Sequence, residues 1–159
     1  MSTTEEIGIE ELTLPPTRRT ILVYYHGVIH KYFISLPSMK FCFKYITENN
    51  IHFLYKSQVV FLLENNLETY CILPNIRFVT NEICLKLNSR KYVSLDEMKR
   101  SVMETFWLQA FSSDWAFCMS YYKNLRVENI IEYFELWQEK TKADRNWIPG
   151  EDFFQVEQE

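Results

Sequence analysis

The spacing of the hydrophobic residues changes near residue 94. Over residues 20–93, apolar and aromatic residues gather in short runs, several of which alternate with polar residues, as half-buried β-strands do. Over residues 94–142, they recur every three to four positions, which is the period of an amphipathic helix. The sequence therefore predicts an α+β fold. We expect an antiparallel β meander, sandwich or small barrel over about residues 20–93, followed by two to three helices over about residues 94–142.

The strongest β signal lies between Thr20 and Pro37. Two runs of β-branched, aromatic and aliphatic residues there flank the pair His26-Gly27. Because glycine tolerates positive φ angles, its position between two β-rich runs indicates a turn. Proline has no N–H to donate, so the second strand is expected to end at Pro37. The sequence thus predicts a β-hairpin that reverses at His26-Gly27.

Residues 38–50 fit two patterns. The alternation of apolar residues with Lys40, Cys42 and Lys44 favours a strand. Helical spacing also brings several apolar residues of this stretch to one face, and Ser38 suits the N-cap of such a helix. Of the two, we favour the strand. Further short strands, joined by turns rich in asparagine, are expected over residues 51–55, 59–63, 69–73, 76–80 and 83–87.

Ser94 and Glu97 form a capping box that predicts the start of the first helix. Its apolar positions are Leu95, Met98, Val102, Phe106 and Ala110. A second helix is expected to carry Trp115 and Tyr122, and a third is expected to begin near Arg126. The apolar positions of the third helix are Val127, Ile130, Ile131, Phe134 and Trp137.

The charges divide the chain into three parts, although the net charge at pH 7 is only −4. Residues 1–16 contain glutamates but no basic side chain, and we expect a flexible acidic lead there. The alternative is a peptide that docks on a partner through Ile7, Ile9, Leu12 and Leu14. Residues 17–148 are predicted to form a single α+β domain whose basic residues lie mainly in the β region. Residues 149–159 are predicted to form an acidic tail.

Motifs of known chemistry are absent from the sequence. A glycine-rich phosphate loop, a GxSxG elbow, an HExxH pair and an EF-hand loop do not occur. His26 and His30 have the four-residue spacing of a same-face pair on a helix, but they lie at a predicted turn, where that spacing makes no such pair, and His52 stands alone. The cysteines are Cys42, Cys71, Cys84 and Cys118. Because no two of them form a CxxC pair, we expect no metal. Without a secretion signal we expect reduced thiols, and without a catalytic motif we expect no cofactor and no catalysis.

The cellular setting is inferred from two further features. The chain has no apolar run of the roughly 18 residues that a membrane span requires, and its first residues lack the form of a signal peptide. We therefore expect an intracellular protein of the cytoplasm or nucleus. Residues with AT-rich codons, such as Ile, Asn, Lys, Phe and Tyr, predominate over Ala, Gly and Pro. This usage is typical of an AT-rich genome, such as that of a virus, a protist or an invertebrate.

Two functions fit this composition. The first is a non-enzymatic interaction module, an adaptor or accessory subunit that binds a protein partner or a second copy of itself. Aromatic residues are favoured at the centres of interfaces. The candidate partner-binding residues are Trp137, Trp147, Phe153 and Phe154.

The alternative is a protein that binds single-stranded nucleic acid through the basic, aromatic-rich β region. Its basic candidates, for contact with phosphate, are Lys31, Lys40, Lys44, Lys56, Arg77, Arg90 and Lys91. Tyr32 and Tyr55 are the candidates for stacking on bases.

Overall fold

A computed structural model describes residues 6–73, 76, 80–108, 111–112 and 130–154. Its strands are β1 (Glu6–Leu14), β2 (Thr17–Tyr25), β3 (Val28–Leu36), β4 (Ser38–Glu48), β5 (Ile51–Leu62), β6 (Glu68–Tyr70), β7 (Lys91–Tyr92) and β8 (Phe111–Ser112). The helices are η1 (Glu64–Asn66), α1 (Leu95–Leu108) and α3 (Ile130–Ala143). Mainly antiparallel strands are thus followed by C-terminal helices, which confirms the predicted α+β class.

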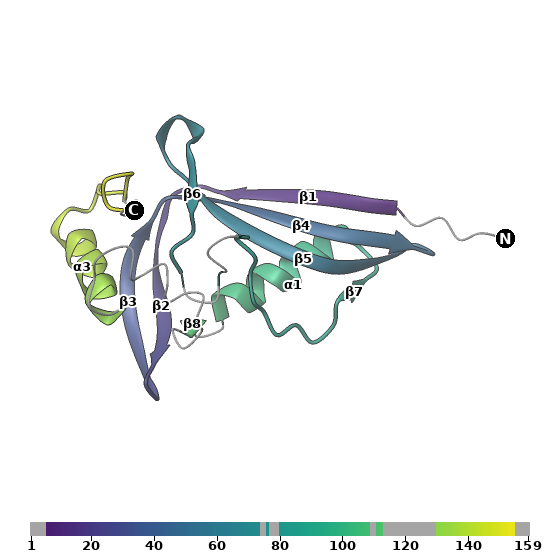
Figure 1. The fold of residues 1–159 in the computed structure, drawn as a ribbon, viewed down its shortest axis with the longest axis horizontal. Helices are drawn as coiled ribbons and strands as arrows, with labels where there is room; N and C mark the ends of the chain where they lie inside the picture. The colour runs from purple at the N-terminus through teal and green to yellow at the C-terminus, as the bar shows by residue number, and fades with distance from the viewer. Residues whose placement is uncertain (1–5, 74–75, 77–79, 109–110, 113–129, 155–159) are drawn as a thin grey trace.

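The strands form two sheets (Figure 1). Sheet A has the order β1-β4-β5-β6, with β7 also paired to β5. Sheet B has the order β3-β2-β8, in which β8 runs parallel to β2. Helix α1 lies along sheet A, and α3 lies beside β3 at the other end of the molecule (Figure 1). Buried side chains of both sheets and both helices form one continuous core.

The hairpin predicted between Thr20 and Pro37 is confirmed. Strands β2 and β3 pair in antiparallel register up to Tyr25 and Val28. Between them, His26 and Gly27 have φ angles of 49° and 81°. Two successive residues with positive φ match the right-handed twist of the flanking strands.

Residues 38–50 form a strand and a turn, as favoured above. Strand β4 ends at Glu48, and Asn49 and Asn50 make the turn with φ angles of 52° and 64°. The separate strands expected over residues 51–55 and 59–63 are one continuous strand, β5. The polar residues between them do not interrupt it because the ladder to β4 uses backbone groups, with one register shift at Lys44/Tyr45.

The prediction of a flexible lead over residues 1–16 is wrong for Glu6–Leu14. These residues form β1, which pairs with β4. Long-range contacts hold this strand. The Oε1 atom of Glu10 forms an ion pair with Nζ of Lys99 in α1 at 3.4 Å. Gly8 lies against the ring of Tyr45, where an added Cβ atom would overlap the ring. An acidic strand is therefore stabilised by partners far along the sequence.

Helix α1 begins as the sequence predicts. The Ser94 hydroxyl oxygen accepts a hydrogen bond from the N–H of Glu97 at 3.0 Å. Met98, Val102 and Phe106 are fully buried, and the Phe106 ring meets Phe41 of β4 edge-on. The second helix predicted around Trp115 and the start of the third near Arg126 lie outside the described residues.

The acidic tail predicted over residues 149–159 folds back on the core as far as Phe154. The Phe154 side chain is only 3% exposed and lies 5.0 Å from the ring of Phe61 and 5.4 Å from that of Trp137. Phe153 stacks on Tyr133 at 5.1 Å. The C-terminal boundary of the packed domain therefore lies beyond the predicted residue 148.

Candidate protein-interaction surface

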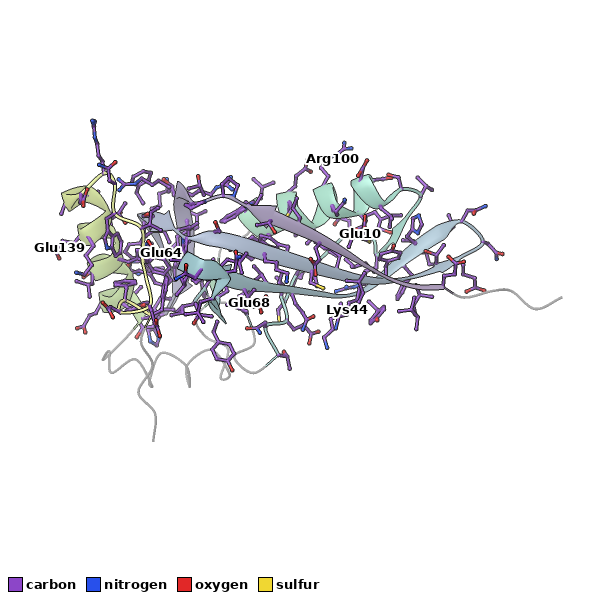
Figure 2. All side chains as sticks on the ribbon, turned by 90° about the horizontal axis from the view of Figure 1, so that it is seen from above. Glu10, Lys44, Glu64, Glu68, Arg100 and Glu139 are labelled. Carbon is purple, nitrogen blue, oxygen red and sulfur yellow. The ribbon has the colours of Figure 1, made fainter. Side chains whose placement is uncertain are left out.

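Sheet A has one covered face and one open face. On the covered face, Phe41 packs against α1, and Glu10 pairs with Lys99 of the same helix. The open face points away from α1, and Figure 2 shows Lys44 and Glu68 on the side opposite Glu10. Because side chains alternate along each strand, the antiparallel register identifies which residues share the open face.

An exposed apolar row crosses the open face at the end of the β4–β5 hairpin. Ile7 of β1 is paired with Ile46 of β4, which is paired with Phe53 of β5. Ile7 is 74% exposed and Phe53 is 41% exposed. Ile9 and Ile51, which lie on the same face next to this row, are 57% and 37% exposed. We call these five residues the apolar tip; contiguous exposed apolar patches commonly mark binding surfaces.

Three lysines lie around the apolar tip, and one carboxylate, that of the exposed Glu48, is at its far end opposite Ile51. Lys44 and Lys56 are directly opposite each other on the open face, next to Ile9, and Lys91 of β7 is paired with Phe53. None of the three makes an ion pair within the described residues. Like charges that face each other across a sheet destabilise it. A partner with carboxylates would therefore relieve repulsion between Lys44 and Lys56.

Lys40, farther along the same face, already has acidic partners. Its ammonium group lies 3.1 Å from Glu68 and 3.8 Å from Glu11. The hydrogen bond to Glu68 raises the pKa of Lys40 above its usual value. This lysine is therefore less available for an external anion than Lys44 or Lys56.

The outer edge of β3 is covered by side chains of α3. The N–H of Phe33 donates to Gln138 Oε1 at 2.7 Å, and the N–H of Ser35 donates to Thr141 Oγ1 at 2.9 Å. Trp137 Nε1 donates to the carbonyl of Ser35 at 2.7 Å. These three bonds replace those of a neighbouring strand, so this part of β3 offers no edge for pairing.

Strand β1 differs from β3 in this respect. Within the described part of the chain, β1 pairs only with β4. Its other edge carries no strand, and Ile7 and Ile9 project beside that edge. An exposed edge next to an apolar face is the arrangement that strand addition by a partner uses.

The structure places the four partner-binding candidates in or against the core. Trp137 is fully buried and Phe154 nearly so, which leaves neither side chain a surface to offer. Trp147 and Phe153 are partly buried and meet edge-on at 5.2 Å. The Trp147 carbonyl accepts a hydrogen bond from Ser35 Oγ at 2.7 Å. These aromatic residues therefore pack the C-terminal segment onto the domain.

The nucleic-acid candidates are divided between separate places. Lys44, Lys56, Lys91 and the 41%-exposed Tyr55 lie around the tip, with Lys40 farther along the open face. Lys31 is on β3 of sheet B, and Arg90 is exposed beside β7. Arg77 is outside the described residues. Tyr32 cannot stack on a base because it is 4% exposed and packs on Phe134 at 5.5 Å.

Ile7 and Ile9 were named from the sequence as docking residues of a peptide, but the strand that carries them and the rest of the apolar tip were missed. The signal for that strand was the alternation of Ile7 and Ile9 with Gly8 and Glu10 in the acidic N-terminal stretch. Which face of that strand α1 would cover depends on tertiary packing, so the exposed set could not be read from the chain alone.

The described residues contain no group of three or more His, Cys, Asp or Glu side chains placed to hold a metal ion. No helix among them is both long and apolar enough to cross a bilayer. Burial raises the pKa of the Cys71 thiol far above its usual value, so this thiol is held protonated and unreactive.

Comparison of the chain with models of known protein families, with curated protein sequences and with solved structures found no match.

Proposed function

We propose that the protein is a non-enzymatic interaction module, an adaptor or accessory subunit, that binds a protein partner through the apolar tip of sheet A. One observation carries this proposal. The row Ile7, Ile46 and Phe53 spans three adjacent strands and is exposed at both of its ends. Burial of apolar area stabilises a complex by about 25 cal/mol per Å², so a partner that covers this row gains binding free energy.

The charges around the tip indicate the chemistry of that partner. Lys44, Lys56 and Lys91 favour an apolar segment that carries Asp or Glu side chains. The bare edge of β1 adds backbone hydrogen bonds if that segment is extended. The tip itself supplies apolar area, lysine amines and backbone groups, which suit binding more than catalysis. Cys42 and Cys71 form no disulfide within the described residues, which fits a reducing compartment, and we propose that the protein acts in the cytoplasm or nucleus.

Replacement of Phe53 by serine is expected to abolish partner binding without unfolding the protein. The matched control is Leu136→Ser on the outer side of α3, because Leu136 is 42% exposed and Phe53 is 41% exposed. Each immobilised full-length variant is incubated with extract of the native cells, and bound proteins are quantified by mass spectrometry. At least one protein retained by wild type and by Leu136→Ser should fall about tenfold or more on Phe53→Ser.

A second copy of the chain is one form that the partner can take. Light scattering on the purified protein then gives twice the monomer mass of 19.3 kDa, and Phe53→Ser restores the monomer. If Phe53→Ser and Ile7→Ser both retain the same bound proteins and the same mass as wild type, the tip is not the binding surface.

The second candidate function, binding of single-stranded nucleic acid, is favoured by the three lysines and Tyr55 around the tip. It predicts that a fluorescent oligothymidine of about 20 nucleotides binds the protein and that the affinity falls steeply as the salt concentration rises. Lys44→Gln is expected to lower the slope of log affinity against log salt by about 0.7, because one phosphate contact is lost. The matched control is Lys140→Gln on α3. Absence of binding at about 50 mM salt, where screening is weak, excludes this function.

A further inference from the structure

A second surface lies at the end of sheet A opposite the apolar tip. It is a groove of about 910 Å³ between the loop that joins β5 to β6 and the chain segment that follows α3. Figure 1 shows that loop projecting from the sheets, with the C-terminal segment beside α3. The volume is in the range of sites that take small ligands or a few side chains of a peptide.

The walls of the groove combine apolar and acidic side chains. Leu67 on the loop is 46% exposed, and Ile148 on the C-terminal segment is 50% exposed. Glu64, Glu68 and Glu151 also line the groove, and no Lys, Arg or His is among its described lining residues. Glu68 is neutralised by Lys40 at 3.1 Å, whereas Glu64 and Glu151 make no ion pair within the described residues.

The two walls are held in place by bonds within the chain. On the loop side, the N–H of Leu63 donates to the carbonyl of Leu67 at 2.8 Å. On the other side, the N–H of Phe153 donates to the carbonyl of Gly150 at 3.1 Å, and Phe153 packs against the core. A groove whose walls are already ordered loses little conformational entropy when it binds a ligand.

We propose that this acidic groove binds a short extended peptide of a partner protein, in which Arg or Lys side chains neighbour Leu or Pro side chains. The basic groups meet Glu64 and Glu151, and the apolar groups cover Leu67 and Ile148. The tip, by contrast, has three lysines and one glutamate, Glu48, around it and favours an acidic partner. The two surfaces therefore select partners of opposite charge, and the groove functions independently of the tip.

The test uses fluorescent eight-residue peptides and full-length protein in about 50 mM salt, where screening is weak. One peptide alternates Leu and Arg, the second alternates Leu and Glu, and the third alternates Gly and Arg. We expect the Leu/Arg peptide to bind with a Kd of about 10–100 µM, the Gly/Arg peptide to bind about tenfold more weakly, and the Leu/Glu peptide not to bind.

Variants then locate the binding site. The double variant Glu64→Gln, Glu151→Gln should weaken Leu/Arg binding at least tenfold, and Ile148→Ser should weaken it severalfold. Glu139→Gln, an exposed change on α3, and Phe53→Ser, at the tip, should leave it unchanged. All of these positions are exposed, so the folded state is retained, and equal melting temperatures verify this.

Two results with the wild-type protein overturn the proposal: equal binding of the Leu/Arg and Leu/Glu peptides, or no saturable binding of the Leu/Arg peptide. Binding of the Leu/Arg peptide that the double variant does not change also overturns it. So does binding of argininamide alone that is as tight as that of the Leu/Arg peptide. Loss of binding on Phe53→Ser would assign the peptide to the tip instead. Because the groove and tip variants are separate, failure of one proposal leaves the other standing.

Discussion

Replacement of Trp137 by alanine is expected to lower the free energy of unfolding by about 3–5 kcal/mol, the usual cost of truncating a large buried aromatic residue. The Trp137 ring is fully buried and lies against Phe134, Phe61 and Phe154. Its Nε1–H also donates to the carbonyl of Ser35 on the edge of β3. One substitution therefore opens a cavity and uncovers a sheet edge. Urea denaturation followed by far-UV circular dichroism measures the loss.

Two further variants separate these contributions. Trp137→Phe keeps most of the ring but removes the donor to Ser35, and it should cost about 1–2 kcal/mol. Leu136→Ala changes the neighbouring, 42%-exposed position of α3 and should cost less than about 0.5 kcal/mol. A loss below about 1 kcal/mol for Trp137→Ala would contradict the packing described for α3.

The second large effect is expected at Arg18, whose replacement by alanine should cost about 1.5–3 kcal/mol, because a charged hydrogen-bond donor is removed. The Arg18 guanidinium, on β2, donates to the carbonyl of Thr141 at 3.0 Å and to that of Asp144 at 2.5 Å. It also contacts the carbonyl of Trp147 at 3.5 Å. These carbonyls are at the C-terminus of α3 and just beyond it, where the helix dipole favours a cation.

The matched control is the next residue, Arg19, which projects to the other face of β2 and lies 4.0 Å from the centre of the Trp107 ring. Arg19→Ala removes one cation–π contact and should cost about 0.5–1 kcal/mol. Arg18→Lys keeps the charge but loses the planar fork, and should recover only part of the stability. Faster amide hydrogen exchange over residues 141–147 in Arg18→Ala would locate the effect. A cost no larger than that of Arg19→Ala would contradict the capping role of Arg18.

The sequence was informative where local chemistry decides the structure. Gly27 marked the first hairpin because few other residues adopt a φ angle of 81°. Ser94 marked the start of α1 because a hydroxyl at that position binds the N–H of residue 97. Apolar residues at helical spacing identified Met98, Val102 and Phe106 as the buried face of α1. Each of these signals lies within a few residues of the structure that it predicts.

The sequence was misleading where distant residues decide. The sequence predicted a flexible lead where β1 lies. The contact that holds Glu10 comes from Lys99, 89 positions away, so no local pattern reveals it. Phe154 was predicted to bind a partner. It is buried instead by Phe61 of β5 and Trp137 of α3, which are distant in the sequence. The candidate surface depended on the same kind of information. Both faces of β5 carry apolar residues, and only the position of α1 determines that Phe53 remains exposed.

The hydrogen bonds from α3 side chains to the outer edge of β3 form late during synthesis of the chain. Phe33 and Ser35 receive their edge partners from residues 102 to 106 positions later in the chain. When β2 and β3 leave the ribosome, α3 has not yet been made, and the edge of β3 stays bare until it emerges. Domains fold as units during synthesis, and unpaired strand edges on incomplete chains aggregate readily. We therefore expect a chain that stalls before residue 137 to aggregate more readily than the complete chain, because α3 closes this edge.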